Sequence, residues 1–448
     1  MQVRLCELHA FSAYISLCRI LPKRVNKLPT WLSFPLSTKA TSSASIGRRV
    51  GLVTFVGGLG GGLVFPILPA LGLQLGIAGA MIGLILSANR ITRMFFDTIA
   101  GHLVDRLGGK KPIALGLFTE CIGILGYSAG IHFGHAAWWF LGGRALFGVG
   151  SALLLVGAQA TVLGLSNVND RGRRVATVRI ATSMGIPGGL VLGGVIADRV
   201  SDNAAFLVGA GLTFIGAIIA LRLIPSTRPQ HEQSSDNSIR TGWSRLSSLL
   251  SLPEFPFLAV AWGFNMLVFL SVQGVLLATL VVFVQQRNFH VLGFAYQGTA
   301  GMVMASTMIC SSVMALFLGR KLDLLTLRSS LVLPALAVLS MGFIVLALAP
   351  SLWMTFLGAM LVGASFNGIS VPMLALLGDV TRPEYYGRGV GVYQLFGDVG
   401  GSLGPIVGLE AGLHFGMLPT YLGVGALLIL SIPVALWAHR RERRWRIH

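Results

Sequence analysis

The chain has 448 residues, of which 54% are hydrophobic and only 11% are charged, and its mean hydropathy is +0.76. This composition excludes an ordinary soluble domain and favours a polytopic membrane protein. The net charge of +18 also raises nucleic-acid binding as a function, but the cations are scattered between apolar segments with no binding fold among them. We therefore expect no nucleic-acid partner, and attraction to anionic lipid headgroups explains the charge better.

The first 47 residues form a basic, Ser/Thr-containing segment whose single acid is Glu7. Such a segment resembles an organellar presequence, and the alternatives are a disordered basic tail or a mis-assigned start upstream of a bacterial coding region. A helical protein that is inserted by its first span needs no cleaved signal peptide. We therefore expect residues 1–47 to lie outside the fold, in a protein of the cell membrane or of an organellar membrane.

Apolar stretches of about 20 residues, each long enough to cross a ~30 Å hydrocarbon core as a helix, recur along the rest of the chain. They predict an all-α membrane protein with twelve transmembrane helices and no soluble domain of any size. The expected spans are residues 50–71, 79–100, 113–131, 136–164, 175–197, 203–223, 257–284, 291–318, 330–349, 351–378, 387–411 and 416–437.

The basic residues orient these spans. Of the 34 Lys and Arg residues, 28 lie on one side, whereas the loops of the opposite side carry only Arg199 and Arg287. By the positive-inside rule, both termini are expected in the cytoplasm. The remaining four arginines lie inside the spans and are Arg90, Arg93, Arg144 and Arg179.

A short charged turn, residues 101–112, separates the second and third apolar stretches. It resembles the signature between helices 2 and 3 of the major facilitator superfamily, which reads glycine-x-leucine-x-aspartate-arginine-x-glycine-basic-basic. A chance polar hairpin in another polytopic protein is the alternative, and the number of matched positions favours the transporter family. The matching residues are Gly101, Leu103, Asp105, Arg106, Gly108, Lys110 and Lys111.

The resemblance implies a gate at this turn. In the family, the aspartate at the position of Asp105 meets the cytoplasmic start of helix 11 and nearby arginines when the transporter faces outward. A carboxylate at a helix N-terminus is electrostatically favourable, and the partner region in this chain is residues 384–388. The expected gating residues are Gly101, Asp105, Arg106, Gly108, Asp323 and Arg388.

The two halves of the chain echo each other. Gly101 and Asp105 recur 218 residues later as Gly319 and Asp323. A stripe of glycines at every fourth position occurs twice, and the second copy follows the first by 215 residues. Both copies predict close helix packing, and the proline of the second copy predicts a kink. The packing residues are Gly185, Gly189, Gly193, Gly400, Gly404 and Pro405.

The repeat and the resemblance together predict two pseudo-symmetric six-helix bundles, residues 48–224 and 256–438. Between them, residues 225–255 are polar and are expected to form a cytoplasmic linker. A basic cytoplasmic tail is expected at residues 439–448.

Arg144 lies about eight residues into the fourth span, hence ~12 Å deep, where an arginine costs several kcal/mol unless it faces a cavity or a partner. Its frame, residues 144–150, resembles the helix-4 motif of the superfamily, whose arginine is implicated in proton coupling or in binding a substrate anion. The alternative is an ion pair that serves packing alone.

Two carboxyl groups are candidate proton carriers. Asp398 lies near the midplane in the eleventh span, and Glu120 lies seven residues into the third. Burial in an apolar medium disfavours a charged carboxylate, which is what a proton carrier requires. The alternative for Asp398 is a permanent bond to a neighbouring serine or arginine.

Other polar residues inside the spans are candidates for the solute cavity. Arg90, Arg93 and Asp97 share one helical face, on which Arg93 and Asp97 are spaced to pair with each other. An anion-attracting face of the cavity is the alternative. Further candidates, each of which alone is more often an interhelical hydrogen-bonding residue, are Arg179, Asn265 and Asn367.

Other functional classes lack their chemistry in this sequence. It contains no Walker loop, no metal-ligand spacing and no nucleophile–base constellation, so we expect no cofactor and no enzyme activity. Four cysteines give no disulfide framework. Transport must then be driven by a gradient, and protons are the expected coupling ion.

The direction of transport depends on residues 185–198. They resemble the helix-5 motif of drug:proton antiporters in their glycine pair and following Asp198, although Leu190 occupies the expected proline position. We therefore expect a monomeric, proton-coupled exporter of a small solute. The alternatives are coupled uptake or facilitated transport of a sugar or an organic anion, and a transport-inactive scaffold or a channel.

Overall fold

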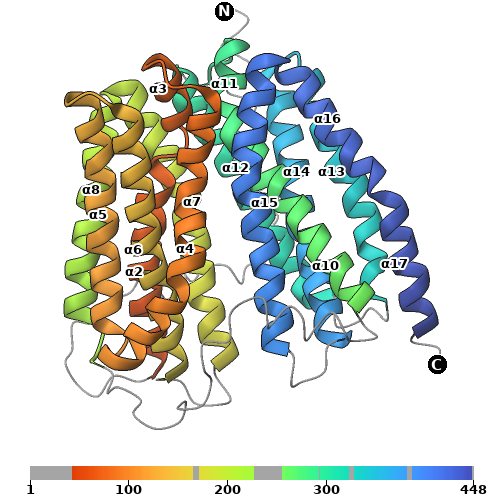
Figure 1. The fold of residues 1–448 in the computed structure, drawn as a ribbon, viewed down its shortest axis with the longest axis horizontal. Coiled ribbons are helices and arrows are strands. Elements are labelled where there is room, and N and C mark those ends of the chain that lie inside the picture. The colour runs from red at the N-terminus through yellow and green to blue at the C-terminus, as the bar shows by residue number, and fades with distance from the viewer. Residues whose placement is uncertain are drawn as a thin grey trace, which may run out of the picture.

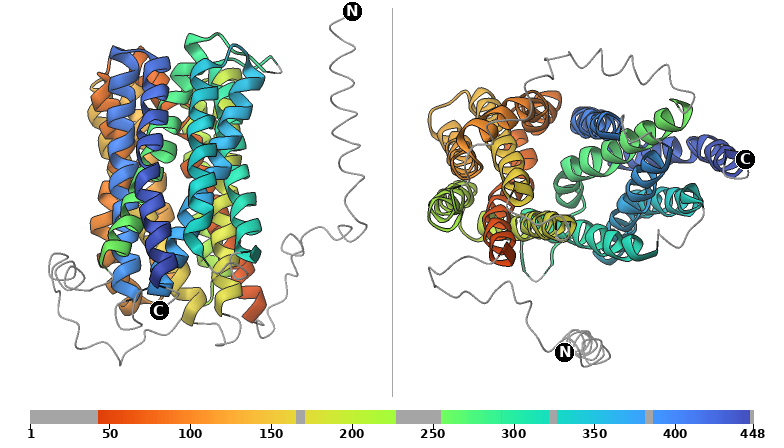
Figure 2. Two further views of the ribbon diagram at one scale, coloured as in Figure 1. Left: turned by 90° about the vertical axis from the view of Figure 1, so that its right-hand side faces the viewer. Right: turned by 90° about the horizontal axis from the view of Figure 1, so that it is seen from below.

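The computed structural model describes residues 43–164, 171–226, 255–291, 293–321, 327–380 and 386–445. These residues form long helices that run side by side in two groups, one from each half of the chain (Figure 1; Figure 2). The expected N-terminal tail up to residue 42, residues 227–254 of the expected linker and Asp323 lie outside the described residues.

The first group is built from the N-terminal half. Its helices are joined by short turns, which place consecutive helices antiparallel and next to one another. Its elements are α2 (Ser43–Leu63), α3 (Leu68–Gln74), α4 (Gly79–Leu107), α5 (Lys110–His132), α6 (Ala136–Gly164), α7 (Arg171–Arg199) and α8 (Asp202–Leu223).

The second group is built from the C-terminal half. Its first long rod is continuous but contains a π-helical stretch, η3, and its last rod is divided at Ser431. Its elements are α10 (Phe255–Val268), η3 (Phe269–Leu276), α11 (Leu277–Gln286), α12 (Tyr296–Lys321), η5 (Arg328–Leu331), α13 (Val332–Leu348), α14 (Leu352–Val380), α15 (Tyr386–His414), α16 (Met417–Leu430) and α17 (Ile432–Trp445).

Ten helical stretches among the described residues are long and apolar enough to cross a membrane. The long helices α4 and α15 are not among them, although each has 29 residues. Both carry charged residues within their length, which lowers their hydropathy: Arg90, Arg93 and Asp97 in α4, and Asp398 in α15. These two helices therefore differ in chemistry from the other long helices.

The described chain begins and ends at the same end of the molecule, the lower end in Figure 1. The expected C-terminal tail is helical up to Trp445, as the last part of α17. In this part, the Glu442 side chain is fully buried, and its carboxylate accepts hydrogen bonds from the backbone amides of Arg328 and Ser329, both at 2.9 Å. The last turns of α17 are thereby attached to the start of η5, which leads into α13.

The first glycine stripe packs α7 against α2. A Cβ atom added to Gly189 would lie 2.9 Å from the Cα of Gly62, and one added to Gly185 would lie 3.1 Å from the Cα of Gly58. The two backbones therefore touch directly, and a larger residue at either position of α7 would push the helices apart.

The second glycine stripe does the same in the other group. Gly404 of α15 faces Gly274 of η3, and a Cβ added to it would lie 2.5 Å from the Cα of Gly274. Pro405 follows inside α15. Because the equivalent stripes join equivalent helices in the two groups, the internal repeat of the sequence has a direct counterpart in the structure.

The two groups meet at the upper end in Figure 1, where α4 packs on α15 and α7 packs on α12. A Cβ added to Gly83 would lie 2.5 Å from the Cα of Ile406, and one added to Gly194 would lie 2.8 Å from the Cα of Gly298. Towards the lower end, Phe95 of α4 is 71% exposed, and a Cβ on Gly101 would meet no described atom within 4 Å. Among the described residues, the halves are thus joined at the upper end and apart at the lower end.

Candidate functional site

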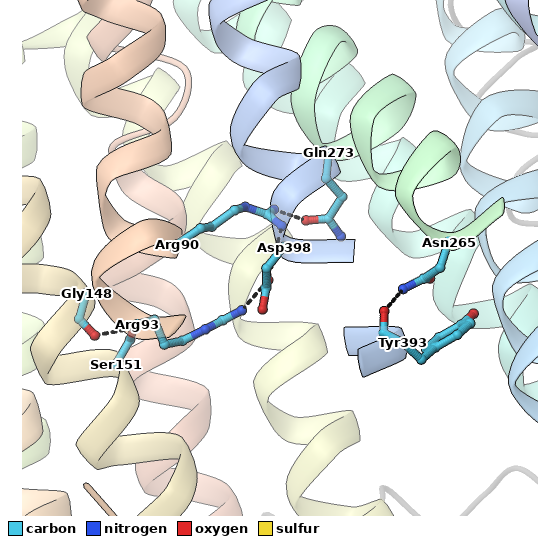
Figure 3. A network of polar contacts seen from close by, with 8 residues as sticks. All are labelled: Arg90, Arg93, Gly148, Ser151, Asn265, Gln273, Tyr393 and Asp398. Carbon is cyan, nitrogen blue, oxygen red and sulfur yellow. Dashed lines mark hydrogen bonds and ion pairs between the residues drawn. The ribbon is translucent and has the colours of Figure 1, made fainter. Parts of the chain in front are cut away.

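The charged residues of α4 and α15 meet at the junction of the two groups (Figure 3). Arg93 donates from Nη2 to Oδ1 of Asp398 at 2.7 Å, and Nη1 of Arg90 lies 3.9 Å from the same oxygen. Arg90 also donates to Oε1 of Gln273 at 2.5 Å. One carboxylate of the second half therefore holds two arginines of the first half.

Burial makes these contacts strong. The side chain of Asp398 is 5% exposed, and those of Arg90 and Arg93 are 14% and 22% exposed. Charge-assisted bonds gain strength where water is largely excluded, but an uncompensated charge in such a place is costly. The network is therefore sensitive to any change in its charge balance.

The partner of Arg93 differs from the sequence-based expectation. Spacing predicted a pair with Asp97 on the same helix, whereas Arg93 binds Asp398 across the junction, and no ion pair joins Arg93 to Asp97 among the described residues. The helical spacing of Arg93 and Asp97 permits the local pair, but the approach of α15 offers a more buried carboxylate. That approach depends on contacts distant in sequence.

Small residues allow this approach. The hydroxyl of Ser87 lies within hydrogen-bonding distance of two carbonyl oxygens, those of Gly83 at 2.7 Å and Ser402 at 2.5 Å. The guanidinium of Arg90 rests against Gly401, where any side chain would collide with it. Gln273 reaches the network from η3, and π-helical turns in long helices are frequent at functional sites.

A second group of polar residues is buried inside the first half, away from the junction. Arg144 of α6 and Glu120 and Tyr127 of α5 are each no more than 1% exposed. All three nitrogens of the Arg144 guanidinium, Oε2 of Glu120 and the hydroxyl of Tyr127 have no hydrogen-bond partner among the described residues. Buried polar atoms are rarely left unpaired in proteins, so this cluster is suited to bind water or a polar ligand.

Aromatic rings surround the Arg144 guanidinium. It lies 4.7 Å from the ring centroid of Phe65, in the turn between α2 and α3, and 5.7 Å from that of Phe147. Such cation–π contacts contribute up to about 2 kcal/mol each when desolvated, which is less than the cost of burying an unpaired charge. The guanidinium also adjoins the Tyr127 hydroxyl without forming a hydrogen bond of good geometry, and it is near enough to Arg90 for electrostatic interaction. Arg144 is therefore the member of the buried cluster that interacts electrostatically with the junction.

The two asparagines of the second half differ in their surroundings. Asn367 of α14 donates to the carbonyl oxygen of Ser311 at 2.8 Å and to its hydroxyl at 2.7 Å, and so joins α14 to α12. Asn265 of α10 donates to the carbonyl oxygen of Tyr393 at 2.7 Å, but its own Oδ1 is buried without a partner among the described residues. Of the two, Asn265 has the free acceptor that a ligand could use.

Aromatic rings of the second half adjoin the charge network. Arg90 lies 5.8 Å from the ring centroid of Phe269, which in turn lies 5.0 Å from that of Phe366. Further along α10, Trp262 stacks on Phe396 at 5.7 Å. The junction therefore presents a cation beside an apolar aromatic surface.

The expected gating residues lie at the open lower end. Asp105 and Arg106 are exposed at the end of α4, and Gly108 ends this helix with a φ of 71°, a value that favours glycine. Arg388 lies in α15 and Arg179 in α7, but their side chains, like Asp323, lie outside the described residues. The structure thus brings together Arg90, Arg93 and Asp398, places Arg144 and Glu120 in a separate cluster, and separates both from Asp105.

Two residues of these sites were not predicted from the sequence. Ser87 is polar but uncharged, and nothing local in the sequence distinguishes it. Tyr127 follows Glu120 by seven residues, two helical turns, and this spacing is a usable signal that was passed over. In the described part of the chain, no cluster of His, Cys, Asp or Glu is arranged to hold a metal ion.

The sequence matches the family profile described as Major Facilitator Superfamily over residues 50–298 and 292–447. It is 24% identical to multidrug resistance protein 1 of Bacillus subtilis (strain 168), over 85% of this chain and 92% of that protein. It is 25% identical to the quinolone resistance protein NorA of Staphylococcus aureus, over 37% of this chain and 42% of that protein.

Solved structures of transporters share the fold. The nucleoside transporter NupG superposes with a TM-score of 0.68 at 15% identity, over 88% of this chain and 98% of that one. The human organic anion transporter MFSD10 gives a TM-score of 0.62 at 17% identity, over 88% of this chain and 100% of that one. At these identities, the likeness shows the fold alone.

Proposed function

The chain belongs to the major facilitator superfamily and is a multi-pass transporter of the plasma membrane, and on this premise we propose that it exports a small solute in exchange for protons. The observation that carries the proposal is the network in which Asp398 of one half holds Arg90 and Arg93 of the other. A carboxylate that exchanges its partners between two conformations is suited to exchange a proton in the same step.

The proposed architecture has twelve transmembrane helices, because α4 and α15 cross the membrane despite their charges. Residues 48–224 and 256–438 form the two bundles, joined by a cytoplasmic linker at 225–255, and the lower end in Figure 1 faces the cytoplasm. The junction at the upper end then makes this the inward-facing conformation, and transport proceeds as the two bundles rock about the solute site. We propose that the working unit is a monomer.

In the proposed cycle, the inward-facing state is the one in which Asp398 has released its proton and is held by the arginines. When the halves separate at the upper end, Asp398 leaves Arg93 and takes up a proton from outside. Glu120 is the second proton site, and it lies in the buried cluster with Tyr127 and Arg144, where polar atoms of all three side chains have no hydrogen-bond partner among the described residues. Arg144 links it electrostatically to Arg90.

The solute is proposed to be an amphipathic aromatic compound. The rings of Phe269 and Phe366 beside Arg90 offer an apolar surface with a cation at its edge, and Oδ1 of Asn265 offers an acceptor. The names of the relatives, multidrug resistance protein and quinolone resistance protein, are compatible with cargo of this kind and with export.

Uptake of an organic anion is the second candidate. Two arginines share a single carboxylate at the junction, and an anionic solute could take the place of Asp398 as their partner. The direction of net transport under a pH gradient distinguishes the two candidates, because the same gradient drives an exporter and a proton symporter in opposite directions.

A proteoliposome screen tests the proposal. A library of aromatic and anionic solutes is offered with an imposed pH gradient, and the orientation of the reconstituted protein is fixed by one-sided labelling. We expect accumulation opposite to the proton flux, lost in Asp398→Asn and Arg144→Ala but kept in Glu410→Gln, which neutralises a half-exposed carboxylate on the same helix. Solute exchange without a gradient is expected to survive in Asp398→Asn. Transport indifferent to the gradient and to a protonophore would refute proton coupling.

A further inference from the structure

The closed upper end contains a second set of contacts between the halves, remote from Asp398. The carboxylate of Asp198, at the end of α7, accepts a hydrogen bond from the backbone amide of Gly298 at 2.6 Å. Gly298 is the third residue of α12, and the amides of Ala295 and Gln297 also face this carboxylate. Asp198 of the first half therefore caps the N-terminus of a helix of the second half.

Neighbouring side chains reinforce the contact from both sides. Gln297 donates to Oδ1 of Asp202, the first residue of α8, at 2.9 Å. Gln74, the last residue of α3, donates to the hydroxyl of Tyr296 at 2.8 Å. The first two residues of α12 are thus each bound by a side chain of the first half.

Two glycines make the capping possible. A Cβ added to Gly194 of α7 would lie 2.8 Å from the Cα of Gly298, so the two backbones are in contact. A Cβ added to Gly298 would lie 2.5 Å from the Oδ2 atom of Asp198 and 3.1 Å from the Cβ of Phe294. Even alanine at position 298 would therefore displace the carboxylate from its place.

Backbone amides favour a carboxylate at this point. The first amides of a helix have no partner within the helix, and the helix dipole adds a partial positive charge there. Among the described residues, Asp202, His290 and Tyr296 are the titratable groups near Asp198, and Arg199 stacks on Phe294 at 4.9 Å. The amides of α12 and the carboxylate satisfy one another only while α7 and α12 are joined.

From these contacts we propose that Asp198 is the latch of the outer gate: its carboxylate on the N-terminus of α12 holds the transporter closed towards the outside, and the latch must break before a solute can leave on that side. Asp202 and Gln74 position Gln297 and Tyr296 for this contact. The proposal requires alternating access but depends neither on the direction of transport nor on the coupling ion.

Asp105 is the counterpart of the latch at the other end of the molecule. Asp105 is exposed in this structure, while Asp198 is engaged. If Asp105 binds the start of α15 when the transporter faces outward, each carboxylate is engaged in the state in which the other is free. When the outer gate opens and the inner gate closes, the contact of Asp198 is lost and the contact of Asp105 is gained. Because one helix-capping carboxylate replaces another, the two states stay close in free energy.

The test measures how far apart the outer ends of the halves lie. Spin labels are placed at Val200→Cys and Gln286→Cys, two exposed positions of opposite halves, after replacement of the four native cysteines, Cys6, Cys18, Cys121 and Cys310. Double electron–electron resonance then gives the distribution of distances between the two labels in the parent protein and in three variants, Asp198→Asn, Gly298→Ala and Gly142→Ala. The last is the matched control, because a Cβ at Gly142 meets no described atom within 4 Å.

We expect Asp198→Asn and Gly298→Ala each to raise the ratio of the long-distance to the short-distance population about three- to tenfold, from the loss of one charged helix cap. Gly142→Ala is expected to leave the ratio unchanged. An unchanged ratio in both latch variants, or an equal shift in the control, would overturn the proposal. Because Gly298→Ala removes no charge and adds a helix-favouring residue, a shift in both variants cannot be ascribed to general destabilisation. A failed solute screen together with an intact distance shift would reject proton-coupled export and leave the latch standing.

Discussion

At the scale of single residues, the junction is unevenly balanced. Among the described residues, Asp398 is the one carboxylate within ion-pair distance of both Arg90 and Arg93, whereas each arginine could lose its contact without leaving Asp398 unpaired. Removing a partner from a buried ion pair is more damaging than the pair is stabilising, because the remaining charge is left without compensation. The three residues are therefore expected to respond differently to neutralisation.

The first prediction is an order of destabilisation. Asp398→Asn leaves two guanidinium groups facing each other and is expected to lower the free energy of unfolding by about 3–5 kcal/mol. Arg93→Gln removes the bond at 2.7 Å but leaves Arg90 at 3.9 Å, and a smaller loss is expected. Thermal unfolding in one detergent, with Glu410→Gln as the control, gives the order. If Arg93→Gln proves more damaging than Asp398→Asn, Asp398 is not the centre of the network.

The second prediction concerns Tyr127. Its ring packs against Phe140 at 5.9 Å and Phe206 at 5.3 Å, while its hydroxyl has no partner among the described residues. Tyr127→Phe keeps the ring and removes an unsatisfied polar group, so stability should be unchanged or rise by up to about 1 kcal/mol. If the hydroxyl takes part in proton movement, gradient-driven transport should nevertheless fall by about a hundredfold, the lower end of what one positioned proton-transfer group typically contributes.

The control for this variant is Tyr421→Phe. Tyr421 is also fully buried, but its hydroxyl is paired with that of Thr279 at 3.0 Å. Its replacement should cost about 1 kcal/mol of stability and leave the coupling intact. Equal coupling ratios in the parent protein and in Tyr127→Phe would show that Tyr127 serves packing only.

The sequence alone predicts much of the residue-scale chemistry, but not its pairing. Charges inside apolar spans are visible without a structure, and Arg90, Arg93, Arg144, Glu120 and Asp398 were all found in this way. Helical spacing, however, proposes only partners on the same helix, such as Asp97 for Arg93. The true partner, Asp398, is 305 residues away, and only the packing of α4 on α15 brings it close.

At the scale of elements, glycine stripes determine which helices can touch. α7 uses Gly185, Gly189 and Gly193 against α2, and the adjacent Gly194 against α12 of the other half. Neighbouring positions of one helix therefore serve two kinds of contact, one permanent and one that must open. The repeat in the sequence predicted the stripes, but it did not indicate that α7 is in contact on two sides.

The third prediction compares a glycine of the permanent contact with a glycine that has no close neighbour. Gly189→Val places side-chain atoms where the backbone of Gly62 lies, 2.9 Å from an added Cβ, and should cost about 1–3 kcal/mol or prevent folding. Gly211→Val on α8 adds the same atoms where no described atom lies within 4 Å. Membrane abundance and unfolding temperature of the two variants are compared. Equal values would mean that α7 and α2 can separate without loss, and that the stripe is not a packing surface.

In the described part of the chain, hydropathy identifies ten candidate membrane-spanning stretches more surely than it identifies α4 and α15. The helices α4 and α15, whose charges meet at the junction, are the two long helices that fall outside the apolarity expected of a span. The physical reason is that a helix facing a polar junction need not be apolar all round. For this fold, the weakest hydropathy peaks mark the helices closest to the candidate site.

At the scale of the whole molecule, the proposed mechanism makes this structure one member of a pair of conformations. The described contacts between the halves lie at the upper end, and Asp105 and Arg106, two of the residues expected to act at the lower end, are exposed. The sequence could name residues of the lower gate through the resemblance, but one sequence encodes both conformations and does not indicate which of them a structure will show.

The fourth prediction follows from this state. Asp105→Asn changes an exposed side chain, so the stability of the protein in the conformation of this structure should change by less than about 0.5 kcal/mol. Transport should still fall by about tenfold, because the contact that Asp105 is expected to form belongs to the outward-facing state. Surface abundance and transport are measured in the same cells, with Thr119→Ala, a change at a half-buried position on α5, as the control. Parallel losses of both quantities would make Asp105 a folding residue.

The attachment of α17 has a practical consequence for how this protein is handled. Basic C-terminal segments of transporters are natural places to trim or to fuse a purification tag, and the sequence here suggests such a dispensable end. Yet Glu442 supplies both acceptors for the amides of Arg328 and Ser329. A truncation before residue 442 would leave these two donors unpaired at the entry of α13, at a cost of about 1–3 kcal/mol for each buried group. The chain should therefore be extended beyond its last residue rather than shortened.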